Sequence, residues 1–262
     1  MDRLSTSLLQ LFAGLGASAP ETVAMPQWRH HFDARGAKGT FVLFEPMLDR
    51  YRTIDPLRAE RRSLPAATFD IANALVGLEV GSIADEGEVF RWDGRTKPFE
   101  AWERDHALDS AMREGVAWMF QEVARRTGKA RMREWLDRLE YGNRDLSGGI
   151  DLFWLQGGLR VSAMEQVRFL HRLAEGRLPM TQRAQRLVRN ALVVERSRDR
   201  TLYARAGSVP TGREAVAWWV GWVERKGRPQ AYFAMNFTPG PRAPVADGVD
   251  IGRAVLREAG VL

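Results

Sequence analysis

The start of one apolar helix is the place where this sequence could best support chemistry on a developing negative charge. Within residues 64–81, Pro65 suits a first helical turn, and Phe69 and Leu75 follow at helical spacing. Such a start gathers unpaired backbone N–H groups and the positive end of the helix dipole. Ala67 stands there, and its methyl group can neither attack a carbonyl nor transfer a proton.

Metal and thiol chemistry have little support in the sequence. The chain has no cysteine and four histidines, so a thiol nucleophile and a thiolate metal site are excluded. We expect the adjacent His30 and His31 to point in different directions, and His106 and His171 are far away in sequence. The sequence therefore predicts no metal site and no cofactor.

Composition and charge distribution predict a folded core and argue against nucleic acid as a partner. Hydrophobic residues make up 45% of the 262 residues, enough for one domain or two closely packed ones, and nine residues are Trp. The net charge is +6. Basic residues alternate with acidic ones, as in 125–138, which is typical of solvated helix faces.

The N-terminal segment decides the expected localisation. Residues 4–19 are too short and too interrupted to span a membrane, but they resemble the apolar part of an export signal ending in Ala-Ser-Ala. We therefore expect a signal segment at 1–24 and a periplasmic or secreted protein, with no transmembrane segment. The alternative is a short amphipathic helix on a cytoplasmic protein.

The order of the expected elements predicts an α+β fold. Strands at both ends of the chain enclose a helical middle part, which indicates a mixed sheet flanked by helices with an all-helical subdomain inserted at roughly 82–195. We expect strands at 39–45, 50–54, 201–209, 215–224 and 230–237, and helices at 67–80, 105–126, 130–139, 162–175, 181–194 and 249–259.

Several motifs together carry a resemblance to a known family. They are Leu64-Pro65-Ala66 with Thr68-Phe69, Asn73-Ala74-Leu75, Gly77-Leu78-Glu79, Trp102-Glu103-Arg104-Asp105, Tyr141-Gly142-Asn143, Ser147-Gly148-Gly149-Ile150-Asp151, Phe153-Trp154-Leu155 and Val216 to Glu224. In this order and spacing, the chain resembles the class D serine β-lactamases of the penicillin-recognising group. The resemblance implies one such domain over 25–262, with its active site in the crevice between the sheet and the helical subdomain.

The chain departs from the family at the positions that carry the chemistry. In the family a serine at the helix start attacks the β-lactam carbonyl, and a carbamylated lysine three residues later acts as general base. Here these positions are Ala67 and Asp70, the second serine falls on Gly115, and Lys-Thr-Gly becomes Arg205-Ala206-Gly207. The resemblance therefore implies a member without intact catalytic residues, a pseudoenzyme that lacks serine acylation.

The remaining family positions imply a binding pocket. The amides of Ala67 and Ser208 correspond to the oxyanion hole, Arg205 would hold an anionic group, and Phe99 and Trp102 would form apolar walls. The expected ligand is a β-lactam or another acidic, peptidoglycan-like molecule. The whole set of expected binding residues is Ala67, Asp70, Phe99, Trp102, Tyr141, Asn143, Trp154, Arg205, Gly207 and Ser208.

Other interpretations stay open from the sequence. We hypothesise that Asp70 pairs with Arg205 or Tyr141 across the former site, although a first-turn acid stabilised by the helix dipole is an equal alternative. Tyr141, Asn143 and Trp154 have structural readings as well. The protein could instead be a weak or altered β-lactam hydrolase, a partner-binding structural protein, or an enzyme that uses Asp70 as a general base.

Overall fold

The protein folds around one seven-stranded sheet, which the computed structural model describes for residues 19–240 and 243–262. The strands are β1 (Glu21–Ala24), β2 (Lys38–Glu45), β3 (Arg50–Thr53), β4 (Val193–Arg196), β5 (Arg200–Val209), β6 (Val216–Arg225) and β7 (Arg228–Thr238), in the order β1-β3-β2-β7-β6-β5-β4. Only β1 and β3 pair in parallel. Because β2 pairs with β7, the sheet is assembled from both ends of the chain, as predicted.

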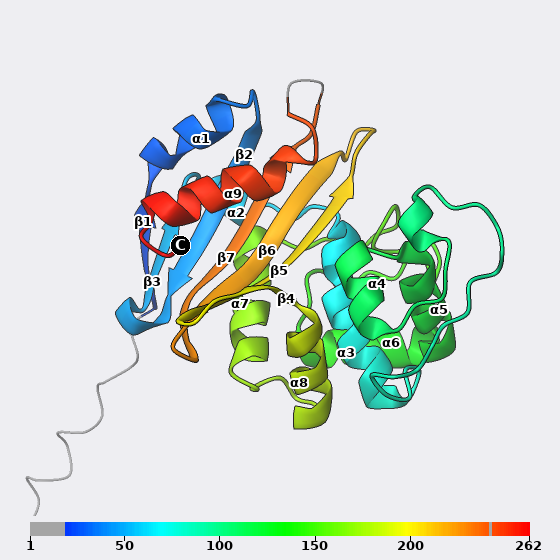
Figure 1. The fold of residues 1–262 in the computed structure, drawn as a ribbon. Helices are drawn as coiled ribbons and strands as arrows, with labels where there is room; N and C mark the ends of the chain where they lie inside the picture. Colours follow the sequence, from blue (N-terminus) through cyan, green and yellow to red (C-terminus); the bar gives the residue numbers. More distant parts are fainter. Residues whose placement is uncertain (1–18, 241–242) are drawn as a thin grey trace, which may run out of the picture.

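Helices cover both faces of this sheet (Figure 1). They are α1 (Arg29–Asp33), α2 (Pro56–Glu60), α3 (Asp70–Val80), α4 (Leu108–Glu114), α5 (Ala117–Thr127), α6 (Lys129–Leu139), α7 (Ala163–Ala174), α8 (Gln182–Ala191) and α9 (Asp247–Glu258), with single 3₁₀ turns η1 (Pro26–Trp28), η2 (Pro46–Leu48), η3 (Ala66–Phe69) and η4 (Glu100–Trp102). On one face lie α1 and α9, and on the other lie α7 and the helical part that contains α3 to α6 and α8.

The two faces have separate hydrophobic cores, and the central strand β6 contributes to both. Trp218 and Trp222 belong to the core on the side of the helical part, while Trp219 belongs to the core beneath α9. Every residue of β6 except its last is buried. This double coverage explains why the strand reads as a continuous apolar run rather than an alternating one.

The structure departs from the sequence prediction at three places. The helix expected at 105–126 is divided at Gly115, whose positive φ of 72° ends α4 before α5 begins. The helix expected at 181–194 ends at Ala191, and β4 follows it. Residues 21–24 lie within the expected signal segment, yet they form β1 of the sheet, while residues 1–18 lie outside the described part.

Two contacts fix the start of α3 against the sheet. The buried indole of Trp218 in β6 donates a hydrogen bond to the Leu64 carbonyl at 2.8 Å. On β5, a Cβ at Gly207 would lie 2.7 Å from the amide nitrogens of Ala67 and Thr68, so only glycine allows this approach. The turn that carries Ala67 is therefore held directly against β5. No helix among the described residues is long and apolar enough to cross a membrane.

Candidate active site

The turn before α3 has a strained backbone. Ala66 adopts a positive φ of 50°, which is unfavourable for a residue with a Cβ, and its amide donates to the carbonyl of Trp154 at 3.1 Å. Thr68 and Asp70 are buried, whereas Ala67 is half-buried. Of these three residues the turn thus leaves Ala67, at the nucleophile position, the most accessible.

A buried ion pair joins β5 to α3 at this turn. The Nη2 group of Arg205 donates to Oδ2 of Asp70, and the side chains of the two residues are only 6% and 2% exposed. This contact confirms the hypothesis that Asp70 pairs with Arg205. Tyr141, the other partner considered for Asp70, instead donates from its hydroxyl to Oε1 of Gln166 at 3.4 Å.

The remaining donors of Arg205 are also used within the protein. Its Nε donates to the Ala67 carbonyl at 3.1 Å, and its Nη1 donates to the Met112 carbonyl at 2.6 Å. One guanidinium therefore connects β5, the η3 turn, α3 and α4. No residue type could signal the Met112 contact, because the acceptor is a backbone atom.

Gly115 lies beside this guanidinium. A Cβ at Gly115 would stand 3.6 Å from Nη1 and 3.7 Å from Nη2 of Arg205. Any longer side chain at this position would extend toward the charged group. The absence of a side chain at 115 and the presence of a long one at 205 are therefore spatially linked.

The electrostatics of the site depend on burial. Burial raises the pKa of the Asp70 carboxyl to about 6, and the adjacent Arg205 guanidinium opposes this rise. Burial also raises the pKa of the Tyr141 phenol well above its usual range. Tyr141 is therefore neutral at physiological pH and cannot serve as an anionic base.

The Thr68 hydroxyl does not replace the missing serine. It donates to the Pro65 carbonyl at 2.6 Å and accepts from Nε2 of Gln166 at 2.7 Å, in a buried position. The hydroxyl therefore both donates and accepts a hydrogen bond within the protein, the accepted one from Gln166 of α7. These hydrogen bonds hold the turn and commit the hydroxyl proton to the Pro65 carbonyl.

Three residues expected in the pocket have structural contacts instead. Phe69 packs against Tyr141 with a centroid distance of 5.6 Å and against Trp154 at 5.4 Å, and both partners are fully buried. Asn143 donates to the Gly158 carbonyl at 2.8 Å and accepts from the Arg160 amide at 2.8 Å. These contacts favour the structural readings of Tyr141, Asn143 and Trp154.

The two aromatic residues expected as walls lie together at the end of α4. The rings of Phe99 and Trp102 are 5.0 Å apart, and the Trp102 indole donates to the Glu114 carbonyl, one residue before Gly115. Phe99 is exposed. Trp102 therefore caps the last turn of the helix that ends beside Arg205.

An open cavity of about 310 Å³ lies along β5. Residues of α4, β4, β5, β6 and α9 line it, among them Arg113, Arg205 and Arg253. On the same strand Ala206 is exposed, while Gly207 and Ser208 are half-buried. The strand edge next to Ala67 is thus accessible, although the Arg205 guanidinium is not.

The prediction that His30 and His31 point in different directions is wrong. Their ring centroids are 3.9 Å apart, and Nε2 of His31 lies 2.7 Å from Oε2 of Glu258 in α9. The sequence could not show this, because Glu258 is 227 residues away from His31. This cluster lies on the face of the sheet opposite to Asp70.

Comparisons with known proteins agree with this architecture. The family model of the penicillin binding protein transpeptidase domain matches residues 49–256. β-Lactamase OXA-48 of Klebsiella pneumoniae is 38% identical over 251 residues, which cover 96% of this chain and 93% of that protein. The probable β-lactamase YbxI of Bacillus subtilis is 42% identical over 186 residues, covering 71% of this chain and 69% of YbxI.

A solved structure has the same fold as this chain. The crystal structure of the class D β-lactamase YbXI from Nostoc superposes with a TM-score of 0.86 at 30% sequence identity, over 90% of this chain and 99% of that one. The mixed sheet with flanking helices is therefore the class D fold, which confirms the prediction. On sequence, family model and fold together, the chain belongs to the class D β-lactamase family.

Proposed function

We propose that this protein is a class D β-lactamase homologue without serine acylation chemistry. The observation that carries the proposal is the buried Arg205–Asp70 ion pair at the two positions where the family's chemistry needs two lysines. With Ala67 at the nucleophile position there is no source of an alkoxide, so no acyl-enzyme can form there.

The alternative in which Asp70 acts as a general base has weaker support. A general base must lie within hydrogen-bond reach of the proton that it removes. The Asp70 carboxylate is bound by Arg205, and the hydroxyl of its neighbour Thr68 is committed to Pro65 and Gln166. No free hydroxyl is bonded to Asp70 among the residues that the structure describes.

The ion pair has a structural role in this proposal. Charges removed from water are costly unless they are paired and their remaining donors are satisfied. Here the guanidinium has one carboxylate and two backbone carbonyls as acceptors. The pair therefore stabilises the arrangement of the η3 turn, α3, α4 and β5. It lies where these elements meet, at the place that a catalytic centre would otherwise occupy.

Non-covalent binding of an acidic ligand is the second candidate function. The close approach of Gly207 to Ala67 keeps the segments that carry the amides of Ala67 and Ser208 in contact, and the cavity lined by Arg205 and Ala206 lies on the same strand, β5. Because Arg205 is occupied, Arg113 at the cavity is the better cation for a carboxylate. The ligand class would be β-lactams or peptidoglycan-like peptides, met in the periplasm or outside the cell.

Incubation with a penicillin should leave the mass of the protein unchanged. The absence of a nucleophile at 67 predicts no covalent adduct in intact-mass spectrometry, even at millimolar penicillin and long incubation, while an active serine β-lactamase trapped by rapid acid quenching serves as the positive control. An adduct equal in mass to the penicillin, mapped by proteolysis to residues 64–81, would overturn the proposal.

A thermal-shift screen tests the second candidate function. Penicillins and acidic peptides should raise the melting temperature of the wild type, because a ligand that binds only the folded state stabilises it. Arg113→Ala should reduce the shift, whereas Arg138→Ala, a surface variant on α6, should not. A flat screen would reject ligand binding and leave the partner-binding structural role.

Removing one of the two charges should lower the free energy of unfolding, whereas removing both should lower it much less. At pH 7 we expect Asp70→Leu and Arg205→Met each to lower the free energy of unfolding by about 3–5 kcal/mol, because each leaves a buried charge unpaired. The double variant should recover most of this loss, which denaturant unfolding of all four proteins measures. Additive losses would show that the pair is not coupled.

The Arg205→Met variant should also have a distinctive pH dependence. Without the guanidinium, the pKa of Asp70 rises above about 6, so the folded state retains a proton that the unfolded state has released. The stability of the variant should then fall as pH rises from 4 through neutrality, by at most about 1.4 kcal/mol per pH unit. In the wild type this fall should end near pH 6.

A further inference from the structure

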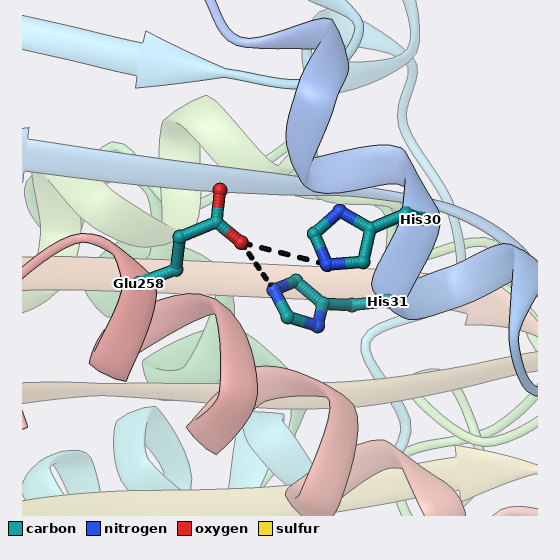
Figure 2. A group of neighbouring side chains, drawn as sticks. All are labelled: His30, His31 and Glu258. Atoms are coloured by element: carbon teal, nitrogen blue, oxygen red, sulfur yellow. Dashed lines mark hydrogen bonds and ion pairs between the residues drawn. The ribbon is translucent and has the colours of Figure 1, made fainter.

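A cluster of three metal-ligating side chains lies outside the candidate active site. His30 and His31 of α1 face Glu258, the last residue of α9, and the three offer ligand atoms within 4.8 Å of one another (Figure 2). Nε2 of His31 is 2.7 Å from Oε2 of Glu258, and Nε2 of His30 is 3.6 Å from the same oxygen. Two imidazoles and a carboxylate thus converge on one point.

The second nitrogen of His30 orients its ring toward the cluster. Nδ1 of His30 lies 2.7 Å from the carbonyl of Gln27. A carbonyl only accepts, so Nδ1 is the donor of this contact, and Nε2 is the nitrogen that faces the Glu258 carboxylate. A backbone carbonyl bound to the outer nitrogen is the usual way in which proteins orient a metal-bound histidine.

The surroundings of the cluster allow a metal ion to enter and to be the main positive charge there. Within the described part of the chain, the two histidines are the only ion-pair partners of Glu258. Arg52 reaches the end of α9, where its Nη2 donates to the Ala259 carbonyl, and its charge is balanced by Glu45 at 2.9 Å. The His30 side chain is 62% exposed, so water and ions reach the site.

We propose that His30, His31 and Glu258 form a binding site for a zinc-type divalent cation. Zinc bound to nitrogen and oxygen at about 2.0–2.2 Å in tetrahedral geometry separates its ligand atoms by about 3.3 Å, and the observed 2.7 and 3.6 Å lie on either side of that value. Imidazole with carboxylate favours zinc, nickel or copper over magnesium or calcium. The fourth position faces solvent and takes water.

The bound cation joins the two ends of the fold. It connects α1 to the end of α9, elements that share the hydrophobic core on the face opposite to Asp70. Because this cluster does not approach Ala67 or Arg205, the metal stabilises the folded chain and takes no part in chemistry at the former catalytic site.

Zinc titration of the untagged full-length protein tests the proposal. Isothermal titration calorimetry on metal-free protein should give one zinc per chain, and zinc at 100 times its dissociation constant should raise the melting temperature by about 5 °C. His30→Gln, His31→Gln and Glu258→Gln should each weaken binding at least about tenfold. Because His30 is mostly exposed, its variant will fold even if the others are destabilised.

Matched controls separate this site from adventitious binding. His171→Gln removes a histidine that also pairs with a carboxylate, Glu175 at 3.1 Å, but has no second imidazole, so zinc affinity should be unchanged. Magnesium should give no shift in melting temperature. No binding of zinc, or binding that His30→Gln leaves intact, would overturn the proposal.

Discussion

The contact between Arg205 and Asp70 is the interaction on which the centre of this protein depends. It joins the sheet to the helical part at the point where the family places its catalytic crevice, and it is almost fully removed from solvent. The family has an anionic carbamate at the first position and a cationic lysine at the second. An aspartate and an arginine keep that order of charges, but here the two side chains pair directly with each other.

The changes around this pair are physically connected. An arginine is longer than a lysine and presents a planar set of donors, which here reach three separate acceptors. A Cβ at Gly115 would lie 3.6 Å from this guanidinium, an ordinary van der Waals distance, and the positive φ of 72° favours glycine there. The strained turn at Ala66 and the close approach of Gly207 nevertheless persist. The turn that carries Ala67 is therefore in close contact with β5, and the buried ion pair lies beside this contact.

Sequence patterns predicted the parts of this account that depend on local periodicity and motif position. Five of the seven strands and most helices followed from them, and the pairing of Asp70 with Arg205 was one of the alternatives left open. The break at Gly115 was missed because apolar residues continue at helical spacing across it. Strand β4 was missed because it is short and mostly exposed and follows α8 almost directly. The expectation that Arg205 would hold a ligand could not account for the Met112 carbonyl, a backbone acceptor that no residue type signals.

The cluster at His30 shows the same limit. Adjacent helical residues point about 100° apart on average, which argued against a shared ligand, but both rings turn toward a carboxylate from the far end of the chain. A contact between residues 227 positions apart has no local signature. The fold therefore brings together one ion pair that motif position anticipates and one cluster that it does not.

Stepwise restoration of the family residues tests the central claim most directly. In Ala67→Ser with Asp70→Lys, Arg205 would either repel the new ammonium group or bind a carbamate formed on it, so no base would reach the serine. We expect no gain in kcat/KM for penicillin hydrolysis from this double change, and a gain once Gly115→Ser and Arg205→Lys are added. Equal kcat/KM values for the double and the quadruple variant would contradict the claim that Arg205 and the missing side chain at Gly115 prevent catalysis.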